Sequence, residues 1–263
     1  MAFALFAGCV TTPETDGDKL NDFTPDIPFT PDESAKGLPT RYTSDAEKTV
    51  IFADGSPETF GWADGYSNGD MFNCVWKRDN ATVSDGVMSM SVKAEKVPSG
   101  NETLDYTGAE YSSKTKYPYG FYSVCMKAAK CSGVVSSFFT YTGPSSGDPW
   151  DEIDIEFLGK DMTKVQFNYY TNGEGGHEKL FDLGYDASAD FHEYAFDWQP
   201  EYITWYVDGI AVYRVSDNLP SHPMKIMANV WNGIGVDGWL GALDASALPA
   251  TAQYLWLAYV PNP

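Results

Sequence analysis

The stretch Trp150-Asp-Glu-Ile-Asp-Ile-Glu-Phe-Leu-Gly159 alternates acidic and apolar side chains from Glu152 to Phe157. A period of two is typical of a β-strand, in which successive side chains point to opposite faces of the sheet. The apolar residues Ile153, Ile155 and Phe157 are then expected to share one face. The other face collects a tryptophan and three acids: Trp150, Glu152, Asp154 and Glu156.

Segments with the same period recur on both sides of this strand, separated by Gly, Pro, Asn and Asp. The dipeptide Asp208-Gly209, between Ile203–Val207 and Ile210–Val215, predicts a tight β-hairpin. Many short strands without long helical segments predict an all-β fold, a sandwich of two antiparallel sheets. Besides the two strands of this hairpin, the predicted strands, the acidic one included, are Val87–Val92, Phe121–Met126, Val134–Tyr141, Ile153–Phe157, Val165–Tyr170, Tyr194–Trp198, Met224–Val230 and Tyr254–Val260.

Three carboxyl groups on one face of a strand indicate a function, because residues two apart lie only about 6.5 to 7 Å from each other and their charges repel. Calcium binding fits poorly, since a straight strand presents its oxygens in a line while Ca²⁺ takes about six to eight oxygens around it. Glycoside hydrolysis uses two carboxyl groups, one as nucleophile or base and one as proton donor. The Cα atoms of Glu152 and Glu156 should lie roughly 13 Å apart, so their side chains must lean together over Asp154. Crowding predicts that one acid stays protonated.

The stretch resembles the active-site signature of family 16 glycoside hydrolases, in particular that of the bacterial lichenases. The resemblance extends over Ala63–Trp76, Val135–Tyr170, Tyr194–Gly209 and Lys225–Leu240, and thus over nearly all of the chain after about residue 50. It implies a jelly-roll sandwich with a concave substrate groove. By position it implies that Glu152 is the nucleophile, Glu156 the general acid/base, and Asp154 the residue that orients and tunes them.

The resemblance also implies a substrate. Laminarinase-like members usually carry an extra residue between the Asp and the second Glu, which is absent here, and plant xyloglucan enzymes typically have His where Trp150 stands. The expected reaction is therefore retaining endo-hydrolysis of β-1,4 linkages adjacent to β-1,3 linkages in mixed-linkage β-glucan, such as lichenan or barley β-glucan. The positions that match the family's substrate-binding residues are Tyr66, Asn68, Glu110, Phe139, Trp150, Asn168, Tyr170, Asn229 and Trp231.

Three positions depart from the family pattern. Lichenases often join the cysteine that matches Cys74 to a second cysteine near Tyr106, and that second residue is not Cys here. Ser112 stands where an arginine is common, which predicts a weaker subsite. Leu255 replaces the Asp of a structural calcium site found in many relatives, so the resemblance does not extend to that site. We expect no metal site and no redox or nucleotide cofactor.

The composition limits the partners. With 17 basic and 37 acidic residues the chain has a formal charge of −20, which would repel nucleic acid and anionic lipid. Aromatic residues make up 15% of the chain and suit stacking on a flat, uncharged ligand such as a sugar. No apolar run approaches the roughly 20 residues that span a bilayer.

The N-terminal part predicts export. Residues 1–9 end in Leu5-Phe-Ala-Gly-Cys9, which resembles a bacterial lipobox, so we interpret them as a lipoprotein-type signal remnant. Residues 10–45 are rich in Pro, Asp and Thr without apolar periodicity and predict a disordered acidic tether. Residues 46–263 then form the catalytic domain. These features predict an extracellular or cell-surface anchored protein.

The sequence leaves two other functions open. A laminarin- or xyloglucan-active enzyme of the same family would keep the chemistry and change the substrate, and a glucan-binding lectin would keep the fold without the chemistry. A lectin has no need of two Glu and a central Asp, so the triplet favours an enzyme. The expected partner is the β-glucan substrate, and an open groove is consistent with a monomer.

Overall fold

Strands make up most of residues 50–51 and 57–262, the part of the chain that the computed structural model describes. Every strand predicted above is present, which confirms the all-β fold. The hairpin turn has positive φ at both central residues, 48° at Asp208 and 77° at Gly209, as a two-residue turn of this type requires. The described helical segments are short: α1 Asp237–Leu240, η3 Arg78–Asn80, η4 Pro144–Ser146 and η5 Ala245–Ala247.

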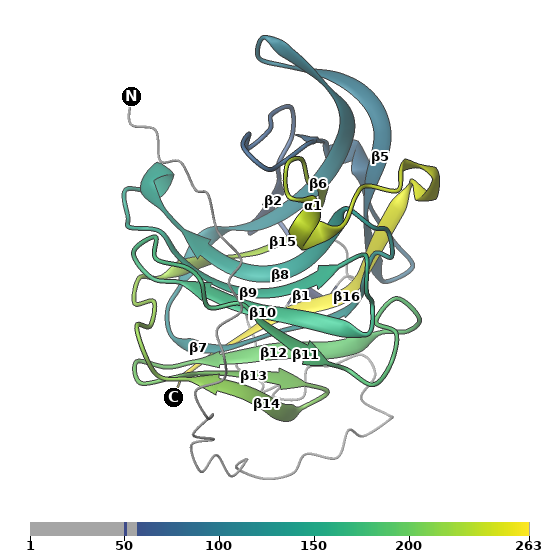
Figure 1. Cartoon of the computed structure of the whole chain (residues 1–263). Coiled ribbons are helices and arrows are strands. Elements are labelled where there is room, and N and C mark those ends of the chain that lie inside the picture. The colour runs from purple at the N-terminus through teal and green to yellow at the C-terminus, as the bar shows by residue number, and fades with distance from the viewer. Residues whose placement is uncertain (1–49, 52–56, 263) are drawn as a thin grey trace.

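The first sheet carries the acidic strand near its middle (Figure 1). Neighbouring strands pair antiparallel, so residues opposite each other form rows across the sheet. In spatial order the strands are β11 Lys179–Asp182, β10 Lys164–Tyr170, β9 Asp151–Leu158, β8 Val134–Thr142, β15 Met224–Asn232 and β6 Glu102–Tyr117.

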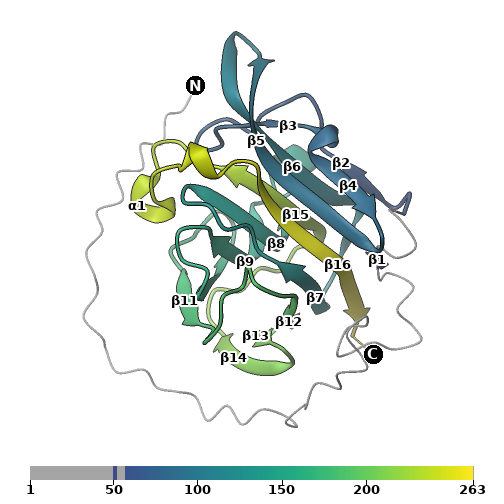
Figure 2. The same ribbon diagram turned by 90° about the vertical axis from the view of Figure 1, so that its right-hand side faces the viewer.

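In Figure 1 the strands β7, β12, β13 and β14 of the second sheet lie below β8, β9 and β10 of the first, and Figure 2 shows β5 and β16 in front of β6 and β15. The two sheets are continuous, because β5 pairs with β6. One short pairing, β3 with β6, is parallel. The main strands of the second sheet are β5 Val87–Ser99, β16 Ala250–Pro261, β7 Gly120–Lys127, β12 His192–Trp198, β13 Ile203–Val207 and β14 Ile210–Val215, and short strands β1 Val50–Ile51, β2 Phe60–Trp62, β3 Val75–Trp76 and β4 Ala81–Ser84 flank the two sheets.

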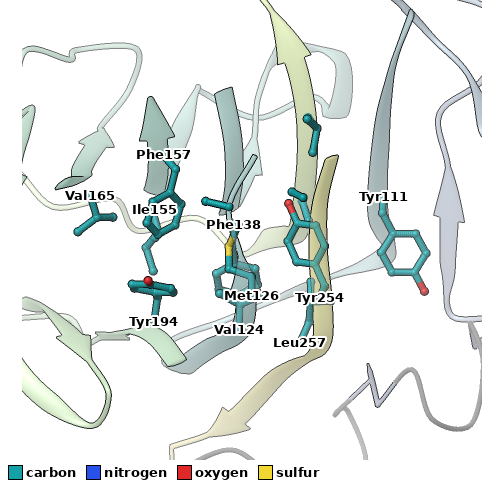
Figure 3. Packing of buried hydrophobic residues seen from close by; sticks show 14 of the residues in the cluster. Tyr111, Val124, Met126, Phe138, Ile155, Phe157, Val165, Tyr194, Tyr254 and Leu257 are labelled. Carbon is teal, nitrogen blue, oxygen red and sulfur yellow. The ribbon is translucent and has the colours of Figure 1, made fainter. Parts of the chain in front are cut away.

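The core lies between the two sheets and is rich in aromatic rings. Figure 3 shows Ile155, Phe157 and Phe138 of the first sheet facing Val124 and Tyr194 of the second. The rings of Phe157 and Tyr194 lie 4.8 Å apart. The apolar face of the acidic strand is therefore buried, as its alternation predicts, and its acids point the other way.

Trp205 connects the second sheet to the acidic strand. Its ring is fully buried, and its indole N–H donates to the backbone oxygen of Asp154 over 3.1 Å. We expect Trp205→Phe to lower the free energy of unfolding by about 2 kcal/mol, because the substitution removes buried ring atoms and one buried hydrogen bond. Urea unfolding checks this expectation, with the half-buried Trp62→Phe as the matched control. Equal stability of the two variants would contradict it.

The three described cysteines, Cys74, Cys125 and Cys131, are all buried and unpaired. A Cβ atom at Gly108 would lie 2.9 Å from Cys74 Sγ, so the glycine leaves room for the thiol, and Tyr106 packs against the apolar cluster that contains Cys74. Leu255 packs beside Cys125 and Trp256 in a small apolar cluster, and its side chain offers no oxygen ligand.

The signal remnant at residues 1–9 and the tether at residues 10–45 lie outside the described residues. No described helix is long and apolar enough to cross a membrane.

Candidate active site

The three acids of β9 share the polar face of the first sheet, the face opposite the core. Asp154 is buried, with 5% exposed, while Glu152 and Glu156 are half-buried. Asp154 pairs with Phe139 on one side and with Asn168 on the other. The three carboxyl groups of β9 therefore lie in a line on this face, and the uncharged Phe139 and Asn168 lie on either side of Asp154.

Glu152 has partners that favour its charged form. The indole N–H of Trp150 donates to Glu152 Oε2 over 2.6 Å, and the side chain of Asp154 is also hydrogen-bonded to Glu152. Burial raises the pKa of Glu152, the two hydrogen bonds lower it, and the charge of Glu110 raises it again. Of the three acids, Glu152 is the one with the most donors to stabilise a carboxylate.

Asp154 behaves in the opposite way. Burial raises its pKa well above the ordinary value, and the charges of Glu152 and Glu156 add to that effect. A protonated Asp154 can donate its proton to the hydrogen bond with Glu152. This shift favours a protonated Asp154, which can support the carboxylate of Glu152.

Glu156 is favoured as the protonated acid. Its Oε2 accepts a hydrogen bond from Gln166 Nε2 at 2.7 Å. Burial raises the pKa of Glu156 to about 8; the bond from Gln166 lowers it, and the charges of Glu152 and Glu178 raise it. The pKa of Glu152 is raised to about 7 and that of Glu156 to about 8, so Glu156 is the one of the two that holds its proton to the higher pH, as a proton donor beside a carboxylate must.

Glu156 also belongs to a polar row across the sheet. Register places Glu110, Asn229, Ser137 and Glu156 opposite one another on β6, β15, β8 and β9. Ser137 donates to Asn229 Oδ1 over 2.6 Å, and Asn229 donates to Glu110 over 3.5 Å. Glu110 is buried, which raises its pKa to about 7. The row gives the face several groups that can hydrogen-bond to hydroxyls.

Two aromatic side chains form a stacked platform beside Glu152. The rings of Trp150 and Tyr170 lie 4.4 Å apart and are nearly parallel, at 13°. Trp150 keeps 37% of its surface exposed, unlike the core tryptophans. Its backbone oxygen accepts from the amide of Gly173 over 2.7 Å, which fixes the loop after β10 beneath it.

Asp151 holds the end of the acidic strand. Its fully buried carboxylate accepts from the backbone amides of Asn172, Ser221 and His222 and from the His222 ring, at distances of 2.8 to 3.0 Å. Burial raises its pKa, and these bonds lower it more, so that it lies below the usual value. Two loops are thereby attached to β9 next to Trp150 and Glu152.

The remaining predicted site residues divide into two groups. Phe139 and Asn168 flank Asp154, as described, and Tyr66 is close enough for the charge of Glu110 to add to the effect of burial in raising its pKa. Trp231 is buried against Phe72, with ring centres 4.2 Å apart. Asn68 accepts from the indole of Trp76 over 3.0 Å. Trp231 and Asn68 thus each contact another side chain of the protein, whether or not they also bind substrate.

Several residues at the site are missing from the predicted set. Tyr141, Ser137 and Gln166 occupy the polar face of strands that were predicted, so strand parity alone could have found them. Trp239 of α1, which donates to Gln166 over 3.1 Å, and Glu178, whose charge reaches Glu156, come from segments without a period. Within residues 50–51 and 57–262, no group of His, Cys, Asp or Glu side chains is arranged to hold a metal ion.

The hydrogen bond from Trp150 to Glu152 should affect how kcat/KM depends on pH. Trp150→Phe keeps an aromatic side chain but removes the indole N–H, so the pKa of Glu152 should rise. With Glu152 as the predicted nucleophile, which attacks in its ionised form, the acid limb of the kcat/KM profile is expected to move to higher pH by about one unit. The alkaline limb, set by Glu156, serves as the internal control. An unmoved acid limb would show that the bond does not tune Glu152.

Comparisons with known proteins agree with this geometry. Residues 68–248 match the model of the family "Glycosyl hydrolases family 16". A protein of Paenibacillus polymyxa named "Beta-glucanase" is 57% identical over 78% of this chain and 83% of its own length. A crystal structure of a prokaryotic beta-1,3-1,4-glucanase (lichenase) from a mouse hindgut metagenome is 54% identical, with a TM-score of 0.77 over 81% of this chain and 98% of that one. The Bacillus licheniformis beta-glucanase structure is 51% identical, with a TM-score of 0.75 over 81% and 97% of the two chains.

Proposed function

This chain belongs to family 16 of the glycosyl hydrolases, and on this basis we propose that it cuts β-1,4 bonds adjacent to β-1,3 bonds inside mixed-linkage β-glucan. The observation that carries the proposal is the pair Glu152 and Glu156 on one face of β9, where Trp150 donates a hydrogen bond to the first and Gln166 to the second. The substrate follows from relatives above 50% identity that are named beta-glucanase or lichenase.

In the first step, Glu156 gives its proton to the glycosidic oxygen while Glu152 attacks the anomeric carbon. The bond between that carbon and the oxygen breaks, and a covalent glycosyl–enzyme ester forms on Glu152. Asp154 supports the ionised Glu152 beforehand through its hydrogen bond. In the second step, the Glu156 carboxylate takes a proton from water, and the water oxygen displaces Glu152 from the anomeric carbon. The configuration at that carbon is retained.

The aromatic and polar side chains around the acids suit a glucan chain. Trp150 and Tyr170 offer a stacked aromatic platform, which favours the apolar face of a sugar ring. Asn168, Asn229 and Glu110 offer hydrogen-bonding groups for hydroxyls. Tyr66, Asn68, Phe139 and Trp231 complete the proposed binding set. The chemistry uses carboxyl groups and water alone, and we propose that no cofactor takes part.

A reducing-sugar assay on three polymers tests the proposal. Barley β-glucan, laminarin and xyloglucan are compared at equal mass, with product length followed by chromatography. We expect short oligosaccharides from barley β-glucan and much slower release from the other two. Faster release from laminarin or xyloglucan would make that polymer, and not mixed-linkage β-glucan, the preferred substrate. Binding to all three polymers without release would indicate a lectin.

Export, surface anchoring and the monomeric state are proposals that rest on the N-terminal sequence and on the open site. Mass spectrometry of the natural protein should find a diacylglyceryl adduct on Cys9. An unmodified Met1 terminus would contradict the anchor, and elution as a dimer in gel filtration would contradict the monomer.

A further inference from the structure

A chain of two hydrogen bonds leads from α1 to the acid/base Glu156. The indole N–H of Trp239 donates to Gln166 Oε1 over 3.1 Å, and Gln166 Nε2 donates to Glu156 Oε2 over 2.7 Å. Gln166 is buried, with 4% exposed, and pairs with Glu156 across β9 and β10. The three side chains thus come from three separate elements and meet at the acid.

The indole decides which way the Gln166 amide faces. An indole N–H can only donate, so it accepts no bond from the NH₂ group and selects the amide oxygen as its partner. The NH₂ group is then the part of the amide that remains for Glu156. If the amide turned over, its oxygen would face Glu156 and would favour the protonated carboxyl instead.

Trp239 can impose this orientation because α1 is attached to the body of the protein. Leu240, the next residue, is almost fully buried in an apolar cluster with Trp231, and its backbone oxygen accepts from Gly133 over 3.1 Å. The rings of Trp231 and Trp239 lie 6.1 Å apart. Trp239 is therefore held from its own element and not only by Gln166.

We propose that Trp239 and Gln166 are positioning residues for Glu156: the indole locks the Gln166 amide with its NH₂ group toward the acid. This inference rests on the proposed function, which makes Glu156 the proton donor. It extends that function, because it makes the protonation of Glu156 on β9 depend on Trp239 of α1.

The charged groups around Glu156 set the background for this effect. Glu152 and Asp154 face it from its own strand, and Glu178 acts on it from the loop before β11. Ser137 on β8 is uncharged, and Lys164 on β10 is paired with Asp182. The Gln166 amide is the group that donates to Glu156 among the described hydrogen bonds. Its removal should therefore make Glu156 harder to ionise.

The test is the alkaline limb of the kcat/KM profile on barley β-glucan, which reports the loss of the proton from Glu156. Gln166→Met keeps the length of the side chain and removes the amide, and should move this limb to higher pH by about one unit. Trp239→Phe frees the amide to turn and should move the limb the same way by about half as much. The double variant should match Gln166→Met, because Trp239 acts through Gln166.

Trp62→Phe is the matched tryptophan control, and the acid limb set by Glu152 is the internal one. An unmoved alkaline limb in Gln166→Met, or shifts that add in the double variant, would overturn the proposal. If Gln166→Met does not fold, as judged by its unfolding transition, an unmoved limb in Trp239→Phe alone overturns it. A wild-type enzyme inactive on every glucan would instead overturn the proposed function.

Discussion

Glu152→Ala is expected to lose at least about 10⁴-fold in kcat on barley β-glucan, because it removes the carboxylate that we propose as the nucleophile. The fold should survive, since Glu152 lies on the polar face of β9 and is not part of the apolar core. Substrate binding should weaken little, because the Trp150–Tyr170 platform remains. Initial rates with purified protein and an unchanged unfolding transition check this expectation.

Glu201→Ala is the matched control for this loss. Glu201 is an exposed glutamate in the turn between β12 and β13 and should leave kcat unchanged. Sodium azide offers a second readout: the small anion can enter the space that the carboxylate leaves and attack in its place. Recovery of activity with azide is expected. Residual activity of Glu152→Ala above about one tenth of wild type would contradict the role of nucleophile.

Glu156→Gln is expected to lose about 10²- to 10⁴-fold in kcat/KM on barley β-glucan, the range that general acid catalysis contributes. The amide keeps the size of the side chain but has no acidic proton to give. A substrate whose leaving group is a phenol of low pKa needs no such proton. On an activated aryl β-glucan oligosaccharide, kcat/KM should therefore stay within about tenfold of wild type.

The contrast between the two substrates separates chemistry from folding. A misfolded variant would lose activity on both. The pH profile gives a further check, because the alkaline limb of wild type should disappear in Glu156→Gln. A loss of equal size on both substrates, with the limb still present, would assign the proton donor elsewhere.

Strand parity alone predicts most of the site. Alternation along β9 places Glu152, Asp154 and Glu156 on one face and buries Ile155 and Phe157 on the other, and the structure has this arrangement. The same parity holds on β8 and β10, where it would also have indicated Tyr141 and Gln166. Side chains with a period of two on a half-buried strand carry enough information to be placed.

Residues without a period could not be placed in this way. The central strand β6 escaped prediction because the buried polar residues Thr107 and Ser113 share the strand parity of the core residues Ala109 and Tyr111, so the apolar alternation is too short to recognise. Trp239 lies on a four-residue helix, too short for a helical pattern. Its contact with Gln166 is set by the path of the chain between β15 and β16, which local sequence does not specify.

Trapping the covalent intermediate is the decisive measurement for the proposed mechanism. Wild-type enzyme is incubated with an activated 2-deoxy-2-fluoro glycoside of a mixed-linkage oligosaccharide, which slows both steps and lets the glycosyl ester accumulate when the leaving group is good. Peptide mapping by mass spectrometry then locates the adduct. We predict a single glycosyl adduct on Glu152. An adduct on Asp154 or Glu156, or turnover of mixed-linkage glucan to products of inverted configuration, would contradict this mechanism.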